Sequence, residues 1–151
     1  MSIEVRLSRD GSIACRIEEL IRVASTSIDA ALYRFNNPRL AEALATAARR
    51  GVRIRVVLDR NKHEETPSTG KLLAHGSLSL RILYGRQGAD TKMHHKFAVF
   101  DGQTAITGSY NWTLESEEQN FENLIVLRDQ ESIALYQREF ATLWAEAAPV
   151  E

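Results

Sequence analysis

Apolar residues recur with two alternating periods along the first half of the chain, and these periods predict its secondary structure. Short apolar or alternating runs fit strands, whereas apolar positions three and four residues apart fit helices. The runs typical of strands are Ile3–Leu7, Ser27–Leu32, Val52–Leu58 and Leu78–Leu83. The segments typical of helices run from Gly11-Ser12 to Ala24, from Pro38 to Arg50 and from Lys71 to His75. Strand–helix–strand alternation of this kind predicts an α/β fold with parallel central strands.

The middle helix of these three has the clearest boundaries. Asn37 is a good N-cap residue, Pro38 suits the first helical position, and Gly51 suits the left-handed residue that follows a helix. In parallel sheets, clefts lie beyond the carboxyl ends of the strands. The segments Tyr33–Asn37 and Asp59–Thr66 are therefore predicted to border a cleft.

The second half of the chain predicts shorter elements. Its strands are Phe97–Phe100, Gln103–Thr107 and Phe121–Leu127, and Ser132–Glu146 has the pattern of an amphipathic helix. Loops are expected at Asp59–Gly70 and Tyr84–Lys92, and Trp112–Gln119 is either a short helix or an extended loop. The last residues are expected to fray.

A hairpin is predicted where two of these strands meet at Asp101-Gly102, a strong signal for a two-residue turn with positive φ. In that register Phe100 faces Gln103, and His94 faces Ser109. Directly opposed side chains have Cβ atoms about 4.5–5.5 Å apart. The hairpin is therefore expected to bring the imidazole and the hydroxyl together.

The same hairpin gathers groups that suit a phosphate. His94 and Lys96 share one face of the strand, His95 projects to the other, and Asn111 lies just past the strand end. Lysine supplies a cationic donor, while serine and asparagine supply neutral ones. The imidazole is the plausible nucleophile or proton carrier near neutral pH.

The spacing of these residues resembles a known signature. The pattern reads His94-x-Lys96-x4-Asp101-x6-Gly108-Ser109-x-Asn111. It looks like the HKD motif of the phospholipase D superfamily. The short chain with one copy of the motif is most similar to the small bacterial Nuc-type endonucleases and their mitochondrial and piRNA-pathway relatives. The resemblance covers nearly the whole chain, and it implies one phospholipase D-like domain over residues 1–151, with a mixed, largely parallel sheet flanked by helices on both faces.

The resemblance also implies a mechanism. In this family two motif copies form one active site, so a chain with a single copy is expected to be a homodimer in which each copy brings its own His94. One neutral His94 would form a phosphohistidine, and the other would act as acid and then as base. Lys96 and Asn111 would hold the phosphate oxygens. Glu122 would accept a hydrogen bond from His94, and Ser109 would assist at the phosphate or orient Glu122.

Two further motif residues are expected to be structural. Asp101 is explained by the turn, and the hairpin points it away from His94. Gly108 has no Cβ, so the backbone beside it can approach an anion closely.

Five residues outside the motif are candidates for substrate binding, each with a simpler alternative. Tyr33 and Phe35 either form a stacking or rim surface or pack within their loop. Arg34 either contacts phosphate or lies in solvent. Arg86 and Lys92 either follow a substrate backbone or belong to an ordinary exposed loop.

Charge and cysteine content limit the kinds of binding site that the chain can form. Residues 1–100 hold 17 basic and 10 acidic side chains, and residues 101–151 hold 2 and 10. This asymmetry either creates a basic face for a polyanion or disappears through pairing across the fold. Cys15 is the one cysteine, so an intrachain disulfide and a cysteine-based zinc site are excluded. No metal or cofactor is expected, because two lysines would replace the usual cationic clamp.

Three functions are compatible with these features. The first is a metal-independent, non-specific endonuclease that cleaves DNA or RNA. The second is a phospholipase D-type hydrolase of phosphatidyl lipids such as cardiolipin, and the third is a non-catalytic nucleic-acid-binding module. The sequence has no membrane span and begins without the apolar region of a signal peptide. These features predict a cytoplasmic protein, or one from which an export or anchoring segment has been removed.

Overall fold

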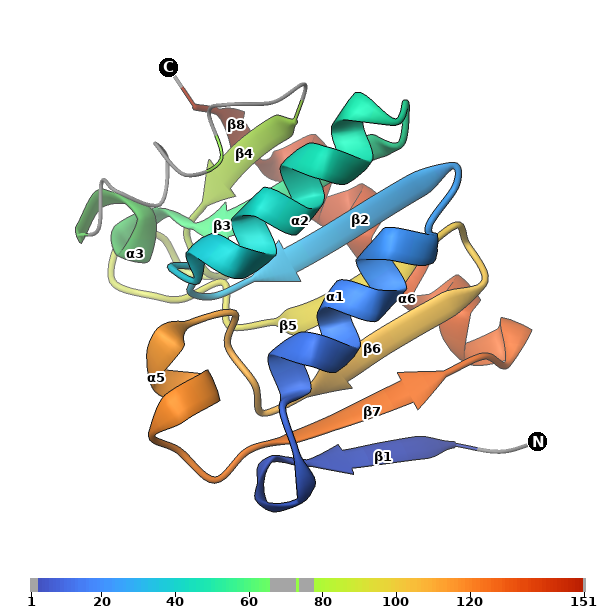
Figure 1. Cartoon of the computed structure of the whole chain (residues 1–151). Coiled ribbons are helices and arrows are strands. Elements are labelled where there is room, and N and C mark those ends of the chain that lie inside the picture. The colour runs from blue at the N-terminus through green and yellow to red at the C-terminus, as the bar shows by residue number, and fades with distance from the viewer. Residues whose placement is uncertain (1–2, 66–72, 74–77, 151) are drawn as a thin grey trace.

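The central feature of the computed structural model, which describes residues 3–65, 73 and 78–150, is an eight-stranded sheet (Figure 1). Its strand order is β1-β7-β6-β5-β2-β3-β4-β8. The strands are β1 (Glu4–Leu7), β2 (Ser27–Leu32), β3 (Arg53–Asp59), β4 (Ser79–Leu83), β5 (Lys96–Phe100), β6 (Thr104–Gly108), β7 (Asn123–Leu127) and β8 (Ala148–Pro149).

Helices cover both faces of this sheet. They are α1 (Ile13–Val23), α2 (Pro38–Arg49), α3 (Arg60–Glu65), α5 (Leu114–Glu118) and α6 (Gln130–Glu146), with a short 3-10 helix at Ser8–Asp10. Figure 1 shows α1 and α2 in front of the sheet and α6 behind it. Each of these three helices begins at a side-chain cap, provided by Ser12, Asn37 and Asp129 respectively.

Alternate strand residues divide the core into two layers. On β5, Ala98 and Phe100 pack with α1 and α2, whereas Phe97 and Val99 pack with α6. This division follows the two-residue period of a strand. The predicted α/β fold, with a mixed sheet and helices on both faces, is confirmed.

The expectation of a largely parallel sheet needs correction. Among the described residues, parallel pairing joins β2 to β3 and β3 to β4, whereas the other neighbouring pairs are antiparallel. Parallel neighbours need a long crossover connection, as α2 provides between β2 and β3. After β4, the strands β5, β6 and β7 pair antiparallel in the order of the chain, and the tight turn at Asp101-Gly102 joins the first two.

The hairpin turn has the expected chemistry but a different register. Asp101 and Gly102 have φ angles of 56° and 62°, as the turn signal predicts. However, Phe100 pairs with Thr104 rather than with Gln103. A slip of one residue exchanges the two faces of a strand, so the predicted opposition of His94 and Ser109 is wrong.

Several element boundaries also differ from the predictions. Part of the expected loop Asp59–Gly70 is the helix α3, and the rest of that loop lies outside the described residues. The predicted helix Lys71–His75 also lies outside them, apart from the buried Leu73. Trp112–Gln119 contains a short helix, and Ala148–Pro149, in the region expected to fray, form β8 and pair with β4. No helix in the described part of the chain is both long and apolar enough to cross a bilayer.

Candidate active site

His94 and Lys96 lie side by side where the chain enters β5. Lys96 Nζ is 3.4 Å from His94 Nδ1 and donates a hydrogen bond to the His94 carbonyl oxygen at 3.1 Å. His95 points to the other face, where its Nε2 lies 2.9 Å from Glu139 on α6 and its ring meets the edge of Phe97. The alternation expected for this segment is therefore present despite the changed register.

The ring of Tyr33 lies next to His94 and close to the ammonium groups of three lysines. Tyr33 directly follows β2, and its ring centroid lies 4.5 Å from that of His94. The Nζ atoms of Lys62, Lys92 and Lys96 lie 5.8, 5.9 and 5.5 Å from the same ring centroid. Ammonium groups are attracted to the faces of aromatic rings. Because Tyr33 is only 8% exposed, its ring mainly supports these side chains from within the protein.

These surroundings change the protonation of both motif residues. Burial lowers the pKa of His94, and the positive charges of Lys96 and Lys92 lower it further. Burial also lowers the pKa of Lys96, although the negative charge of Glu122 opposes this effect. The site therefore favours a neutral imidazole at neutral pH, as a nucleophile requires.

Glu122 is held by hydroxyl and amide donors rather than by the imidazole. Its carboxylate accepts hydrogen bonds from Ser109 Oγ, from Ser116 Oγ at 2.9 Å and from Asn120 Nδ2 at 3.0 Å. Within this single chain no hydrogen bond links Glu122 to His94, so the expected contact is absent here. Of the two roles considered for Ser109, orienting Glu122 is the one that the geometry supports.

The remaining motif residues around the β6 end have mainly structural surroundings. Gly108 has a φ of 149°, and a Cβ at this position would collide with the carbonyl group of Asn123 on β7. Its lack of a side chain therefore permits strand packing, and the expected close approach of an anion to this backbone stays a prediction. The Asn111 backbone N–H donates to Ser116 Oγ at 3.3 Å, and its Oδ1 is buried without a hydrogen-bond partner.

Asp101 lies at the opposite end of β5 from Lys96. Its carboxylate accepts hydrogen bonds from the backbone N–H groups of Ser25, Thr26 and Ser27 at 3.0, 2.8 and 3.1 Å. These contacts fasten the hairpin turn to the start of β2. The structural role expected for Asp101 agrees with this arrangement.

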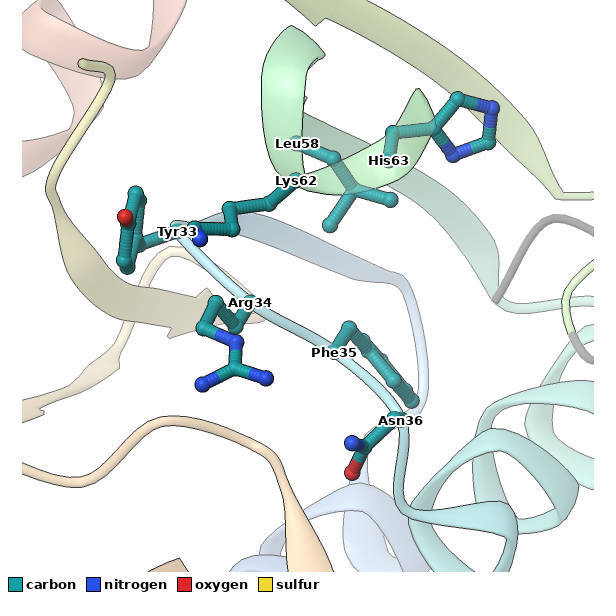
Figure 2. Close-up of a pocket in the computed structure, with 7 residues that line it drawn as sticks. All are labelled: Tyr33, Arg34, Phe35, Asn36, Leu58, Lys62 and His63. Carbon is teal, nitrogen blue, oxygen red and sulfur yellow. The ribbon is translucent and has the colours of Figure 1, made fainter. Parts of the chain in front are cut away.

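The five candidate substrate residues fall into different environments. Phe35 is only 3% exposed and packs against Trp112, which favours loop packing over substrate stacking. Arg86 and Lys92 line a groove that also borders His94, between the loop after β4 and α6. Arg34 lines a separate pocket next to Tyr33 (Figure 2).

Unpaired cations gather near the motif. Most arginines elsewhere in the first hundred residues are ion paired, for example Arg16, Arg39, Arg49, Arg55 and Arg60. In contrast, no carboxylate in the described part of the chain forms an ion pair with four cations around His94. These are Arg34, Arg86, Lys92 and Lys96. Ion pairing thus neutralises much of the excess positive charge. The cations without a carboxylate partner include those around His94.

One residue that the sequence did not single out, Asp59, supports the site. Asp59, at the end of β3, is only 1% exposed, and its carboxylate accepts hydrogen bonds from the backbone N–H groups of Met93 at 2.8 Å and Lys62 at 3.0 Å. This buried carboxylate joins the segment that carries His94 to α3. A polar residue at the carboxyl end of a buried strand is a signal that could have identified Asp59.

Within residues 3–65, 73 and 78–150, no three histidine, cysteine or carboxylate side chains are grouped so as to hold a metal ion.

The chain is similar in sequence to a known family and to curated proteins. Residues 17–144 match the family described as cardiolipin synthase, PLD-like domain. A mitochondrial cardiolipin hydrolase from Danio rerio is 35% identical over 134 residues, which cover 89% of this chain and 58% of that protein. The chain thus spans a little over half the length of this relative.

Two solved structures have a similar fold over nearly the whole of each chain. Nuc from Salmonella typhimurium, a phospholipase D family member, superposes with a TM-score of 0.88 at 25% identity, covering 99% of this chain and 98% of that one. NucT from Helicobacter pylori also gives a TM-score of 0.88, at 21% identity, covering 99% of this chain and 100% of that one.

Proposed function

The chain belongs to the phospholipase D superfamily, and from this premise we propose that it is a metal-independent phosphodiesterase that cleaves DNA or RNA with little sequence preference. One observation carries the proposal. The His94 imidazole, whose pKa is lowered by burial and by the neighbouring positive charges, lies beside Lys96 and Lys92, and neither lysine is ion paired in the described part of the chain. A nucleophile among unpaired cations suits an anionic phosphodiester.

The first half of the reaction uses two copies of His94 at the interface of a homodimer. A ring nitrogen of one neutral His94 attacks phosphorus, and the bond from phosphorus to the leaving oxygen breaks. The second His94, protonated, donates its proton to that oxygen. The product is a phosphohistidine on one chain and a neutral imidazole on the other.

The second half returns the enzyme to its starting state. The neutral His94 removes a proton from water, the resulting hydroxide attacks phosphorus, and the phosphorus–nitrogen bond breaks. Lys96 and Asn111 stabilise the negative charge on the non-bridging oxygens as it develops. Glu122, oriented by Ser109, helps to keep Lys96 protonated through its own negative charge.

The homodimer and the single domain over residues 1–151 are part of this proposal. The dimer is inferred because the chain carries a single copy of the motif, whereas the scheme needs two histidines. The likeness to Nuc over 98% of that chain supports one folded domain over these residues.

The direct test is cleavage of labelled single- and double-stranded DNA and RNA in excess EDTA. We expect the wild-type protein to cut and His94→Asn to lose at least about a thousandfold in rate, because the nucleophile is removed. His95→Asn is the matched control, since its side chain contacts Glu139 on the other face and takes no part in the scheme. It should retain most of the activity.

Two results would count against the scheme. Activity that disappears in EDTA and returns with a divalent cation would show that a metal is required. Nucleic-acid binding without any cleavage, unchanged in His94→Asn, would instead indicate a non-catalytic binding module.

Hydrolysis of phosphatidyl lipids is the second candidate. It is favoured by the 35% identity to a protein named mitochondrial cardiolipin hydrolase. The same histidines and lysines can act on a lipid phosphodiester, because the reacting group is chemically the same. Release of product from cardiolipin vesicles, with no cleavage of any nucleic acid, would favour this candidate.

A further inference from the structure

A pocket beside Tyr33 contains two cations that the proposed mechanism does not use. Arg34 comes from the segment after β2, and Lys62 comes from α3. Figure 2 shows the Lys62 side chain extending from α3 toward Tyr33, with Arg34 next along the same segment. The described residues that line the pocket are Tyr33, Arg34, Phe35, Asn36, Leu58, Lys62 and His63, a set without a carboxylate.

The two cations are available to an external anion. Arg34 forms no ion pair with the carboxylates of the described chain, and its positive charge is felt at Lys62. Lys62 does pair with Glu65 at 2.9 Å, but that carboxylate is 60% exposed. Exposed ion pairs contribute little free energy, about 0–1 kcal/mol, so a phosphate can replace this partner.

Asn36, which lines the same pocket as Arg34, is already engaged in hydrogen bonds. Asn36 donates from Nδ2 to Glu115 on α5 at 3.3 Å and accepts a hydrogen bond from the Leu114 backbone N–H at 2.9 Å. Glu115 lies close enough to Arg34 to have its pKa lowered in part by that charge, yet it forms no ion pair with it. The guanidinium therefore keeps its donors for a ligand.

Tyr33 connects this pocket to the reacting group. Its ring lies 4.5 Å from the His94 ring, between centroids, and its centroid lies 5.8 Å from Lys62 Nζ and 5.5 Å from Lys96 Nζ. The pocket and the reacting site therefore share one aromatic side chain. A ligand that contacts the cations of both must carry two anionic groups a short distance apart.

We propose that Arg34 and Lys62 form a second phosphate subsite, which binds the phosphate next to the scissile one on a nucleic-acid strand. A strand presents one phosphate per nucleotide, so a phosphate bound at Lys96 always has neighbours. A guanidinium can bind a phosphate through two parallel hydrogen bonds, and an ammonium adds a point charge. This inference rests on the proposed nuclease function and specifies the substrate further.

The test compares pairs of small esters that differ by one phosphate. The first pair is thymidine 5′-(p-nitrophenyl phosphate) with and without a 3′-phosphate, and the second is thymidine 3′-(p-nitrophenyl phosphate) with and without a 5′-phosphate. In wild type, the added phosphate should raise kcat/KM about tenfold in one of the pairs, as expected for one charge-assisted contact. The ratio within a pair is the readout, so a general change in rate does not affect it.

Arg34→Gln and Lys62→Gln should each lower that ratio, and the double variant should bring it close to one. Arg22→Gln is the matched control, because it removes the same charge from an exposed position near the end of α1, which precedes β2 in the chain. It should leave the ratio unchanged. A ratio near one in wild type, or a ratio that persists in the double variant, would overturn the subsite.

If the protein is not a nuclease, the experiment gives a different set of results. If wild type hydrolyses none of the four esters, binding is measured by calorimetry with thymidine 3′,5′-bisphosphate and with the two monophosphates. Tighter binding of the bisphosphate in wild type, lost in the double variant, would support the subsite without the activity. Equal binding of the bisphosphate and the monophosphates would overturn the subsite. The same holds if wild type hydrolyses cardiolipin vesicles but binds the bisphosphate no more tightly than the monophosphates.

Discussion

The positive charges around His94 affect both the binding of a phosphate and the protonation of the imidazole. Lys96 and Lys92 are placed where they can attract a phosphate, and the same charges disfavour a proton on the imidazole. Burial acts in the same direction and is the larger effect. A histidine in this position can therefore be neutral at a pH where an ordinary histidine is partly protonated.

The lowered pKa of His94 should be visible in its titration. Its imidazole signal in NMR should titrate with a midpoint below the ordinary value of about 6.5. Lys96→Gln should move the midpoint upward, because a positive charge that opposes protonation has been removed. His94→Asn identifies the signal, and Arg22→Gln serves as a distant control. A midpoint that stays the same in Lys96→Gln would contradict this account.

Among the elements, the pairing of β2 with β5 builds the site. These strands are antiparallel, and the register ends with Leu32 opposite Lys96. The residue after β2 therefore lies beside the residues before β5, and Tyr33 donates its backbone N–H to the His95 carbonyl oxygen at 2.8 Å. At the other end of the same strand pair, Asp101 binds the backbone before β2 and helps to hold this register.

Asp101→Asn is accordingly expected to lower the free energy of unfolding by about 1–3 kcal/mol, the range for hydrogen bonds that involve a charged group. Urea unfolding at pH 7 measures this change. Asp90→Asn, at an exposed position in the loop before β5, is the matched control and should change stability little.

The difference in free energy of unfolding between wild type and Asp101→Asn should also depend on pH, and the direction of that dependence follows from the pKa of Asp101. Burial raises the pKa of Asp101, but the hydrogen bonds from Thr26, Ser27 and Ser25 outweigh this effect, and the pKa is lowered overall. A lowered folded-state pKa contributes stability above the unfolded value of about 3.9, and this contribution is lost as the pH falls through the folded pKa. Wild type and Asp101→Asn should therefore converge in stability at acidic pH. A constant difference down to that range would contradict the assigned role.

At the scale of the whole molecule, one chain presents half of the proposed machinery. It carries one His94, and its Glu122 is bound to donors of its own chain rather than to the imidazole. The scheme needs a second histidine as acid and base. A two-fold arrangement of identical chains would supply it, because each copy contributes the same surface.

Mixed dimers test this arrangement. Wild-type and His94→Asn chains, co-expressed in equal amounts and allowed to pair at random, should show about one quarter of the wild-type specific activity, since that share of dimers keeps both histidines. Light scattering should give twice the chain mass. About half of the wild-type activity, as independent chains would give, would contradict a shared site.

The sequence by itself determined the features that depend on local chemistry. The two periods of apolar residues predicted most helices and strands, Asn37 and Pro38 marked the start of α2, and Asp101-Gly102 marked the turn. The spacing of His94 and Lys96 indicated the phospholipase D superfamily. These features could be predicted because each depends on residues close together in the chain.

Only the tertiary structure decided what depends on distant segments. The hairpin register, one residue away from the expected one, follows from the packing of β5 and β6 within the sheet. The antiparallel pairing of β2 and β5 brought Tyr33 to His94, and burial of Asp59 tied α3 to the same segment. Long-range pairing and burial decide which residues become neighbours, and neither can be read from spacing along the chain. For that reason the motif could be found in the sequence, whereas the contacts that Tyr33 and Asp59 make with its segment could be found only in the fold.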